Sequence, residues 1–341
     1  MTMIATQQKN RNINLSRIIA EAIALEMERD ETIVLLGEDI GKIGGVFGAS
    51  RGLISRFGEK RVRDMPISEI AFTGMGVGLS MAGYRPLVEI MFIDFIGACF
   101  EQLLNAMSKI PYMSGGNTKI PMVVKTAAGC IGSAAQHSQC LWGTLAHLPG
   151  LHVVAPSNPY DYKGLMASAL ESDNPVIFIE HKSQMHQKSQ SFYNNRAVPE
   201  ERYTVPIGKA AVTRTGKDLT IVAPSANAEH ALEAANELLQ HSIDVEVVDL
   251  RSIVPLDIDT LSASVSKTGR LLVVDEDYRS FGLSGEIVTQ LFEQLGPSGI
   301  RQFHRHAMPD LPLPASKPLE RAVIPSASSI VLAARYMAER S

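Results

Sequence analysis

The stretch MPISEIAFTGMGVG, residues 65–78, and the run RPLVEI, residues 85–90, decide the fold of this chain. The first predicts a helix over residues 70–82, and the second predicts a strand. A helix followed at once by a strand is the repeating unit of α/β proteins. Glu69 is an acid in apolar company, so it must be exposed, paired or held for a purpose.

The same alternation extends in both directions along the chain. Strands are predicted at residues 32–39, 120–127, 151–156 and 175–182, and helices at residues 15–30, 95–109 and 158–172. Residues 183–205 are polar and aperiodic, which indicates a linker, and a second alternating series follows them. We therefore expect an α/β protein with two parallel-sheet-rich domains, residues 1–182 and 206–341, joined by residues 183–205.

Composition excludes several classes of protein. The chain has 341 residues, 45% of them hydrophobic, and a formal net charge of −4, so it has no basic excess for binding nucleic acid. No apolar run is long enough for a membrane span, and the N-terminal residues have no apolar core typical of a secretory signal. Three cysteines without CxxC spacing argue against a disulfide framework, and we expect a cytoplasmic protein.

Two small-residue segments invite functional interpretations. The glycines at 74, 76, 78 and 83 do not have the G-x-G-x-x-G spacing after a strand, so a nicotinamide-dependent oxidoreductase is disfavoured. The segment GCIGSAAQHSQC, residues 129–140, surrounds His137 with small side chains. Composition alone leaves open whether His137 is an ordinary loop residue or a catalytic one.

A series of motifs, in order along nearly the whole chain, carries a family resemblance. They are LLGEDIGKIGGVFGASRGL, DMPISEIAFTGMGVGLSMAGYRPLVEIMFIDF, MSGG, AAQHSQ, HLPGLHVVAPSNPYDYKGL and DNPVIFIEHK. The chain resembles the beta subunit of thiamine-diphosphate-dependent 2-oxo acid dehydrogenases. That resemblance implies a transketolase-like pyrimidine-binding domain followed by a C-terminal domain.

The resemblance also implies an activity. It points to an oxidoreductase of the pyruvate dehydrogenase type, which decarboxylates a 2-oxo acid and passes the acyl group to a lipoyl acceptor. An acetoin dehydrogenase subunit is the main alternative, and a biosynthetic acyl- or acyloin-transfer subunit is another. A non-catalytic assembly subunit is disfavoured because Glu69 and His137 are both present.

Residue roles follow from the same resemblance. Glu69 matches the glutamate that hydrogen-bonds the aminopyrimidine of thiamine diphosphate, and Met91 and Phe95 match positions that pack around the cofactor. His137 matches an active-site histidine for proton transfer. A monovalent cation such as K⁺ is expected at five backbone carbonyls, those of Met122, Ala169, Leu170, Ser172 and Asn174.

What the sequence lacks predicts a partner. In this superfamily, a Gly-Asp-Gly motif marks the Mg²⁺ site for the diphosphate, and this chain has no such motif. We therefore expect an alpha subunit that supplies the Mg²⁺ ligands, in an assembly of two alpha and two beta chains, with a lipoyl acyltransferase core as a further partner. Residues 140–143 and 183–195 depart from many relatives and weaken any inference about the particular substrate.

Overall fold

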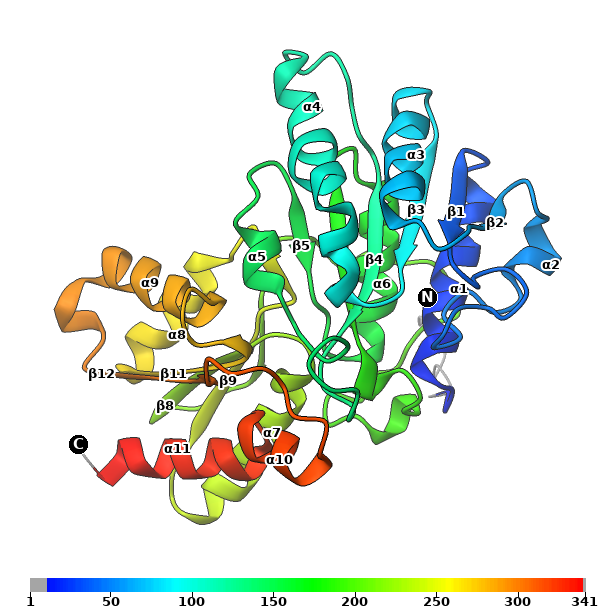
Figure 1. The fold of residues 1–341 in the computed structure, drawn as a ribbon. Coiled ribbons are helices and arrows are strands. Elements are labelled where there is room, and N and C mark those ends of the chain that lie inside the picture. The colour runs from blue at the N-terminus through cyan, green and yellow to red at the C-terminus, as the bar shows by residue number, and fades with distance from the viewer. Residues whose placement is uncertain (1–10, 340–341) are drawn as a thin grey trace, which may run out of the picture.

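The computed structural model describes residues 11–339, which form two β-sheets with helices on both faces of each (Figure 1). The first sheet has seven strands in the order β10-β5-β6-β4-β3-β1-β2, all parallel to their neighbours except β10. Its strands are β1 (Ile33–Gly37), β2 (Val62–Asp64), β3 (Arg85–Ile90), β4 (Val123–Ala128), β5 (His152–Val154), β6 (Val176–His181) and β10 (Ser252–Val254).

Two groups of helices cover the first sheet. One apolar cluster joins α1 and α6 to one face, and another joins α3 and the segments after β3 to the opposite face. The helices of this part are α1 (Leu15–Arg29), α2 (Leu53–Phe57), α3 (Glu69–Met81), the 3₁₀ helix η1 (Ile93–Cys99), the π-helix η2 (Gln102–Met107), α4 (Ser108–Met113), α5 (Trp142–Ala146) and α6 (Pro159–Glu171).

The second sheet has five strands in the order β12-β11-β8-β9-β7. Helices α7 and α11 pack on one face, and α8 and α9 pack on the other. The strands are β7 (Ala211–Arg214), β8 (Leu219–Ala223), β9 (Val245–Asp249), β11 (Arg270–Tyr278) and β12 (Gln302–Met308). The helices are α7 (Ala226–Gln240), α8 (Ile258–Thr268), α9 (Leu283–Gly299), α10 (Lys317–Val323) and α11 (Ala327–Glu339).

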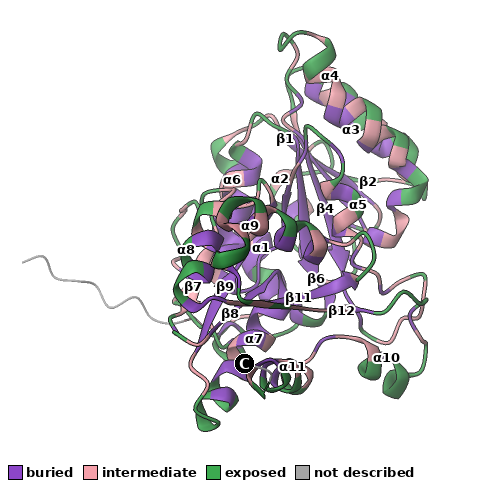
Figure 2. Cartoon of the chain, turned by 90° about the vertical axis from the view of Figure 1, so that its left-hand side faces the viewer, coloured by how far each residue is buried: buried purple, intermediate pink, exposed green. Residues whose placement is uncertain are grey.

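The two sheets share one apolar core. A single cluster of buried side chains runs from β3 and β4 through α5 to α8, α9 and β11. Strand β10, from the second half of the chain, also pairs with β5 of the first sheet. Figure 2 shows the central strands of both sheets as buried, whereas α3 and α4 keep exposed faces. Between the sheets, residues 182–205 form only the short 3₁₀ helices η3 (Lys182–Gln184) and η4 (Ser189–Ser191).

Several predicted elements differ from the structure. The helix expected at residues 95–109 is instead η1, η2 and α4 in succession, and Pro111 lies inside α4. Proline lacks the N–H that would bond four residues back, which favours irregular helix in the preceding turn. Strand β12 was not predicted, because His and Arg alternate through QFHRHAM and hide its apolar character. Within the described residues, no helix is long and apolar enough to cross a membrane.

Candidate active site

Four neighbouring parallel strands bring the candidate residues to one edge of the first sheet. Strands β1, β3, β4 and β6 are adjacent, so their carboxyl ends lie together. Ligands of open α/β sheets bind outside this edge. The residues that leave these four strands are Glu38, Met91, Gly129 and Lys182.

Glu69 is the first residue of α3 and is partly exposed. Its apolar neighbours Ile67 and Ile70 are 85% and 50% exposed, so this end of the helix is not packed inside the chain. Burial raises the pKa of Glu38, and the charge of Glu69 raises it further. Among the described residues, Glu38 Oε1 is buried without a hydrogen-bond partner. A polar ligand group could bond this oxygen atom.

His137 lies in the segment 129–143, which we call the His137 loop. Its partly buried imidazole packs edge-to-face against two rings of the segment after β3, with centroid distances of 5.7 Å to Phe92 and 5.4 Å to Phe95. The two rings therefore restrict the orientation of the imidazole.

The backbone around His137 is held by two buried side chains of opposite charge. Lys182 Nζ donates to the carbonyl oxygen of His137, and Asp94 Oδ1 accepts both the backbone N–H (3.2 Å) and side-chain Nε2 (2.9 Å) of Gln139. Lys182 Nζ is 3.8 Å from Asp94 Oδ2 and 4.9 Å from the centroid of the Phe92 ring. We call Lys182 and Asp94 the loop clamp.

The loop clamp has unusual electrostatics. The side chain of Lys182 is 0% exposed and that of Asp94 2% exposed. Burial lowers the pKa of Lys182, and the charge of Asp94 only partly offsets this effect. Asp94 Oδ2 has no hydrogen-bond partner within the described residues. Lys182 is consequently the cation on which the buried Asp94 carboxylate depends.

The structure brings together part of the predicted site. Phe95 and His137 are in contact, and Met91 lies at the end of β3, one residue before Phe92. Glu69 is the first residue of α3, which packs against β3. The sequence interpretation missed the loop clamp and Phe92. Phe92 and Asp94 follow β3 closely and Lys182 follows β6, and a position just after a parallel strand could have pointed to them.

The carbonyls expected to bind a monovalent cation are already hydrogen-bonded. Arg85 Nη1 donates to Ser172 O (2.8 Å) and Leu170 O (3.5 Å). The other three carbonyls, those of Met122, Ala169 and Asn174, accept bonds from Val176 N, Ser172 N and Ser172 Oγ. Arg85 also pairs with Asp173 at 2.6 Å, as does Lys119. A guanidinium beside two of the carbonyls fits poorly with a K⁺ ion there, because like charges repel.

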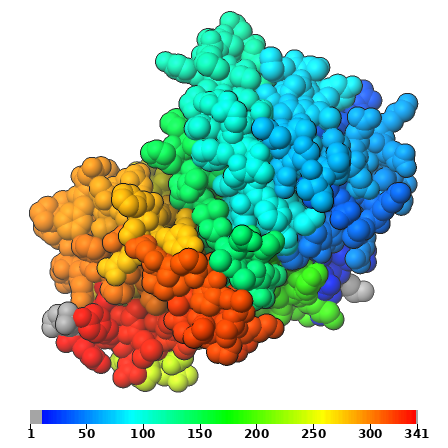
Figure 3. All heavy atoms as spheres, in the orientation of Figure 1, coloured from blue at the N-terminus to red at the C-terminus, as the bar shows by residue number. Residues whose placement is uncertain are grey.

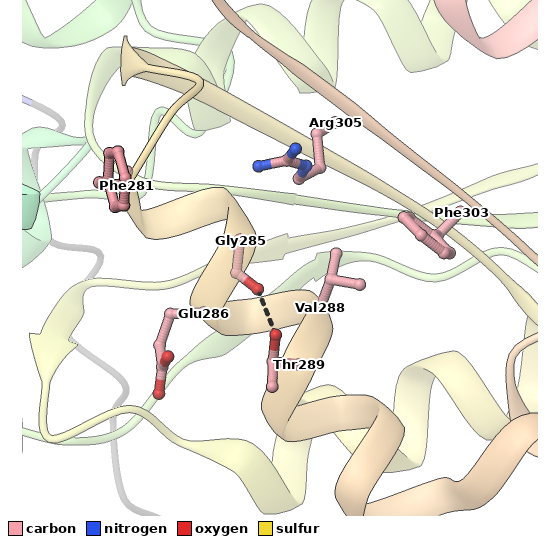
Figure 4. Close-up of a pocket in the computed structure, with 8 residues that line it drawn as sticks. Phe281, Gly285, Glu286, Val288, Thr289, Phe303 and Arg305 are labelled. Carbon is pink, nitrogen blue, oxygen red and sulfur yellow. Dashed lines mark hydrogen bonds between the residues drawn. The ribbon is translucent and has the colours of Figure 1, made fainter.

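Two other features lie outside this set of residues. Cys140 Sγ, His181 Nε2 and a Glu276 carboxylate oxygen lie within 4.8 Å of one another, a donor set that could hold a metal ion. A direct 3.0 Å bond joins His181 Nε2 to Glu276 Oε2, which pairs these two atoms without a metal. A pocket of about 460 Å³ lies between α9 and β12, where Phe281, Phe303 and Arg305 line it (Figure 4).

Known protein families and proteins match this chain over almost its whole length. Residues 11–188 match the transketolase pyrimidine-binding domain, and residues 208–330 match the transketolase C-terminal domain. The chain is 41% identical to the beta subunit of acetoin:2,6-dichlorophenolindophenol oxidoreductase from Cupriavidus necator, over 95% of this chain and 97% of that one. It is 38% identical to the beta subunit of the pyruvate dehydrogenase E1 component from Bacillus subtilis, over 96% and 99%.

A solved structure supports the fold. A split-gene transketolase, described as an inactive beta4 tetramer, superposes with a TM-score of 0.75 over 96% of this chain and 98% of that one, at 23% identity. The transketolase-like fold expected from the sequence is thus confirmed. The chain belongs to the family of transketolase-like beta subunits that includes those of pyruvate dehydrogenase E1 components and of acetoin oxidoreductases.

Proposed function

We propose that this chain is the beta subunit of a thiamine-diphosphate-dependent 2-oxo acid dehydrogenase of the pyruvate type. It decarboxylates the 2-oxo acid and transfers the acyl group to a lipoyl acceptor, together with an alpha subunit. The observation that carries the proposal is the gathering of Glu38, Met91 and the His137 loop at one sheet edge. Three free buried cysteines suit the cytoplasmic location that we also propose.

The residues present suit the aminopyrimidine half of thiamine diphosphate. Glu69 offers a partly exposed carboxylate, the buried Glu38 Oε1 lacks a partner, and the partly buried Met91 and Phe95 offer apolar contact. When bound, the cofactor supplies the carbon nucleophile and the electron sink for decarboxylation. In this proposal, Glu69 would hold a proton at the pyrimidine ring nitrogen.

His137 is suited to move a proton near the substrate. Phe92 and Phe95 orient its ring, and the loop clamp holds its backbone. An imidazole has a pKa close to neutrality, so a well-placed ring serves as either general acid or general base. We assign His137 to the acyl-transfer step.

The diphosphate half of the site belongs to another chain in this proposal. The sequence has no Gly-Asp-Gly motif, and Mg²⁺ requires oxygen ligands in near-octahedral geometry. An alpha subunit supplies them in an assembly of two alpha and two beta chains, to which a lipoyl acyltransferase core can bind. We leave K⁺ out of the proposal because Arg85 already donates to two of its predicted ligands.

Acetoin cleavage is the second candidate function. A specific observation favours it, since the identity to the acetoin oxidoreductase subunit is 41%, against 38% for the pyruvate dehydrogenase subunit. Turnover of pyruvate and of acetoin by the same assembled enzyme, each followed with dichlorophenolindophenol, decides between the two.

The substitution Glu69→Gln in the assembled enzyme tests the proposal. We expect turnover to fall by about 10²–10⁴-fold, the usual range for one placed proton-transfer group. Glu59→Gln is the matched control, because Glu59 is an exposed acid on a loop before β2. If Glu69→Gln and Glu59→Gln both keep the wild-type rate, the proposed role of Glu69 is wrong.

A further inference from the structure

Four buried carboxylates lie in the C-terminal part of the chain and face the first sheet. Asp275, Glu276 and Asp277 are consecutive residues near the end of β11, and Glu320 lies on α10. Their exposed fractions are only 0%, 4%, 6% and 5%. Buried carboxylates must be hydrogen-bonded or paired, so their partners show what they do.

Each of these carboxylates has one partner in the His137 loop. At its start, Glu276 Oε1 accepts the N–H of Cys130 (2.9 Å), and Glu320 Oε2 accepts the N–H of Gly132 (2.9 Å). Figure 3 shows the orange-red C-terminal residues lying against green residues from the middle of the chain. The start of the loop is thereby fixed to two elements of the C-terminal part.

The end of the loop is fixed in the same way. Asp275 Oδ1 accepts Nε1 of Trp142 (2.9 Å), and Asp277 Oδ2 accepts the N–H of Gly143 (3.0 Å). These partners open α5, which lies beside α9 in Figure 1. Asp275 Oδ2 also accepts the N–H of Ser284 (3.0 Å), so this acid is anchored within its own part of the chain.

The loop needs such anchors because of its backbone conformation. Ala134 and Leu141 have positive φ angles of 63° and 42°, which residues other than glycine rarely adopt. Such residues persist only where surrounding contacts hold them. The backbone of the loop also lies close to His181, because a Cβ at Gly129 would lie 2.2 Å from His181 Nε2.

We propose that Asp275, Glu276, Asp277 and Glu320 are positioning residues that set the conformation of the His137 loop from the C-terminal part of the chain. This inference rests on the proposed function for its catalytic consequence. The four acids do not touch the substrate; they fix both ends of the loop, while the loop clamp fixes its middle. The C-terminal part thereby contributes to the placement of His137.

The test uses Asp277, whose contact with the loop is a single backbone bond. Asp277→Ala removes the acceptor for Gly143 N–H, whereas Asp277→Asn keeps an oxygen that can accept it. The matched control is Asp257→Ala, because Asp257 is also buried and accepts from Ala210 N and Thr260 within the C-terminal part.

Two readouts are measured for each variant. In the assembled enzyme, we expect Asp277→Ala to lower kcat by about 10- to 100-fold, with KM changed far less, because small misplacement of a catalytic group costs that much. Asp277→Asn restores most of the rate, and Asp257→Ala keeps it. In the isolated full chain, Trp142 is the one tryptophan. Of the three variants, we expect only Asp277→Ala to shift its fluorescence emission.

The outcomes separate this inference from the proposed function. Wild-type enzyme that turns over neither pyruvate nor acetoin contradicts the proposed function, while the Trp142 signal still decides the loop contact. A kcat for Asp277→Ala within about twofold of the control overturns the inference. So does an unchanged Trp142 emission spectrum. If Asp277→Ala does not fold, Glu320→Ala, which removes the acceptor of the Gly132 N–H, is measured for kcat and KM, and a kcat within about twofold of the control again overturns the inference.

Discussion

Replacing Lys182 by methionine tests the loop clamp, because it removes the cation and keeps most of the side-chain volume. Asp94 Oδ2 would then be buried without a hydrogen-bond partner or a nearby cation. At the observed separation of 3.8 Å, Coulomb's law with an effective dielectric constant of about 20 gives about 4 kcal/mol. This figure lies within the ~3–5 kcal/mol expected for breaking a buried ion pair.

The measurement is a double-mutant cycle in the isolated full chain. Urea unfolding followed by Trp142 fluorescence is compared for wild type, Lys182→Met, Asp94→Asn and the double variant. We expect Lys182→Met to lower the free energy of unfolding by about 3–5 kcal/mol. The double variant should lose at least ~2 kcal/mol less than the sum of the single variants, because the unpaired charge is gone.

A second lysine separates stability from catalysis. The side chain of Lys163 is 1% exposed and pairs with Glu21 at 2.5 Å, in α6 and α1 rather than near His137. Lys163→Met should cost comparable stability, yet only Lys182→Met should slow acyl transfer in the assembled enzyme. Equal effects of the two substitutions on turnover, together with additive energies in the cycle, would refute the loop clamp.

Two further predictions concern pH and K⁺. Burial raises the pKa of Glu229 to about 7, so the folded state keeps a proton that the unfolded state releases near pH 4.5, and stability falls as pH rises between these values. Glu229→Gln should make the free energy of unfolding less dependent on pH, by up to ~1.4 kcal/mol per pH unit, in urea unfolding measured from pH 4 to 8. If the free energy of unfolding varies with pH in the same way in wild type and variant, the raised pKa of Glu229 is contradicted. Exchange of NaCl for KCl should leave the melting temperature of the full chain unchanged, because the Arg85 guanidinium lies against the carbonyls of Leu170 and Ser172. A K⁺ site filled at 100 times its Kd would instead add about 2.7 kcal/mol, and a K⁺-specific rise in melting temperature would show it.

Much of the fold could be predicted from local patterns. The run RPLVEI forms β3 at Arg85–Ile90, and the helix expected at 70–82 is α3, Glu69–Met81. Apolar periodicity predicted both, and α3 packs against β3, which follows it directly in the chain. It missed α2, α5, α8 and α10 and the strands β2, β7 and β12. It also gave no sign that Ser252–Val254 joins the first sheet, since that pairing depends on a partner about 100 residues away.

The candidate site was less accessible from the sequence. Glu69, Met91, Phe95 and His137 were assigned roles by resemblance, and those roles stay predictions. The acids at 275–277 look like an exposed strand end in the sequence, yet they are buried because the His137 loop packs over them. Lys182 and Asp94 are likewise far apart in the chain, and only the folded sheet edge brings them within 3.8 Å.

The most direct test of the central claim compares the purified chain alone with the chain assembled with its alpha subunit. Both are titrated with thiamine diphosphate and Mg²⁺ by calorimetry and then assayed for 2-oxo acid decarboxylation. We predict weak binding and no turnover for the chain alone, because the proposal gives it only the aminopyrimidine side of the site. For the assembly we predict tight Mg²⁺-dependent binding with turnover. Tight Mg²⁺-dependent binding with turnover by the isolated chain would contradict the claim that the active site is shared between two chains.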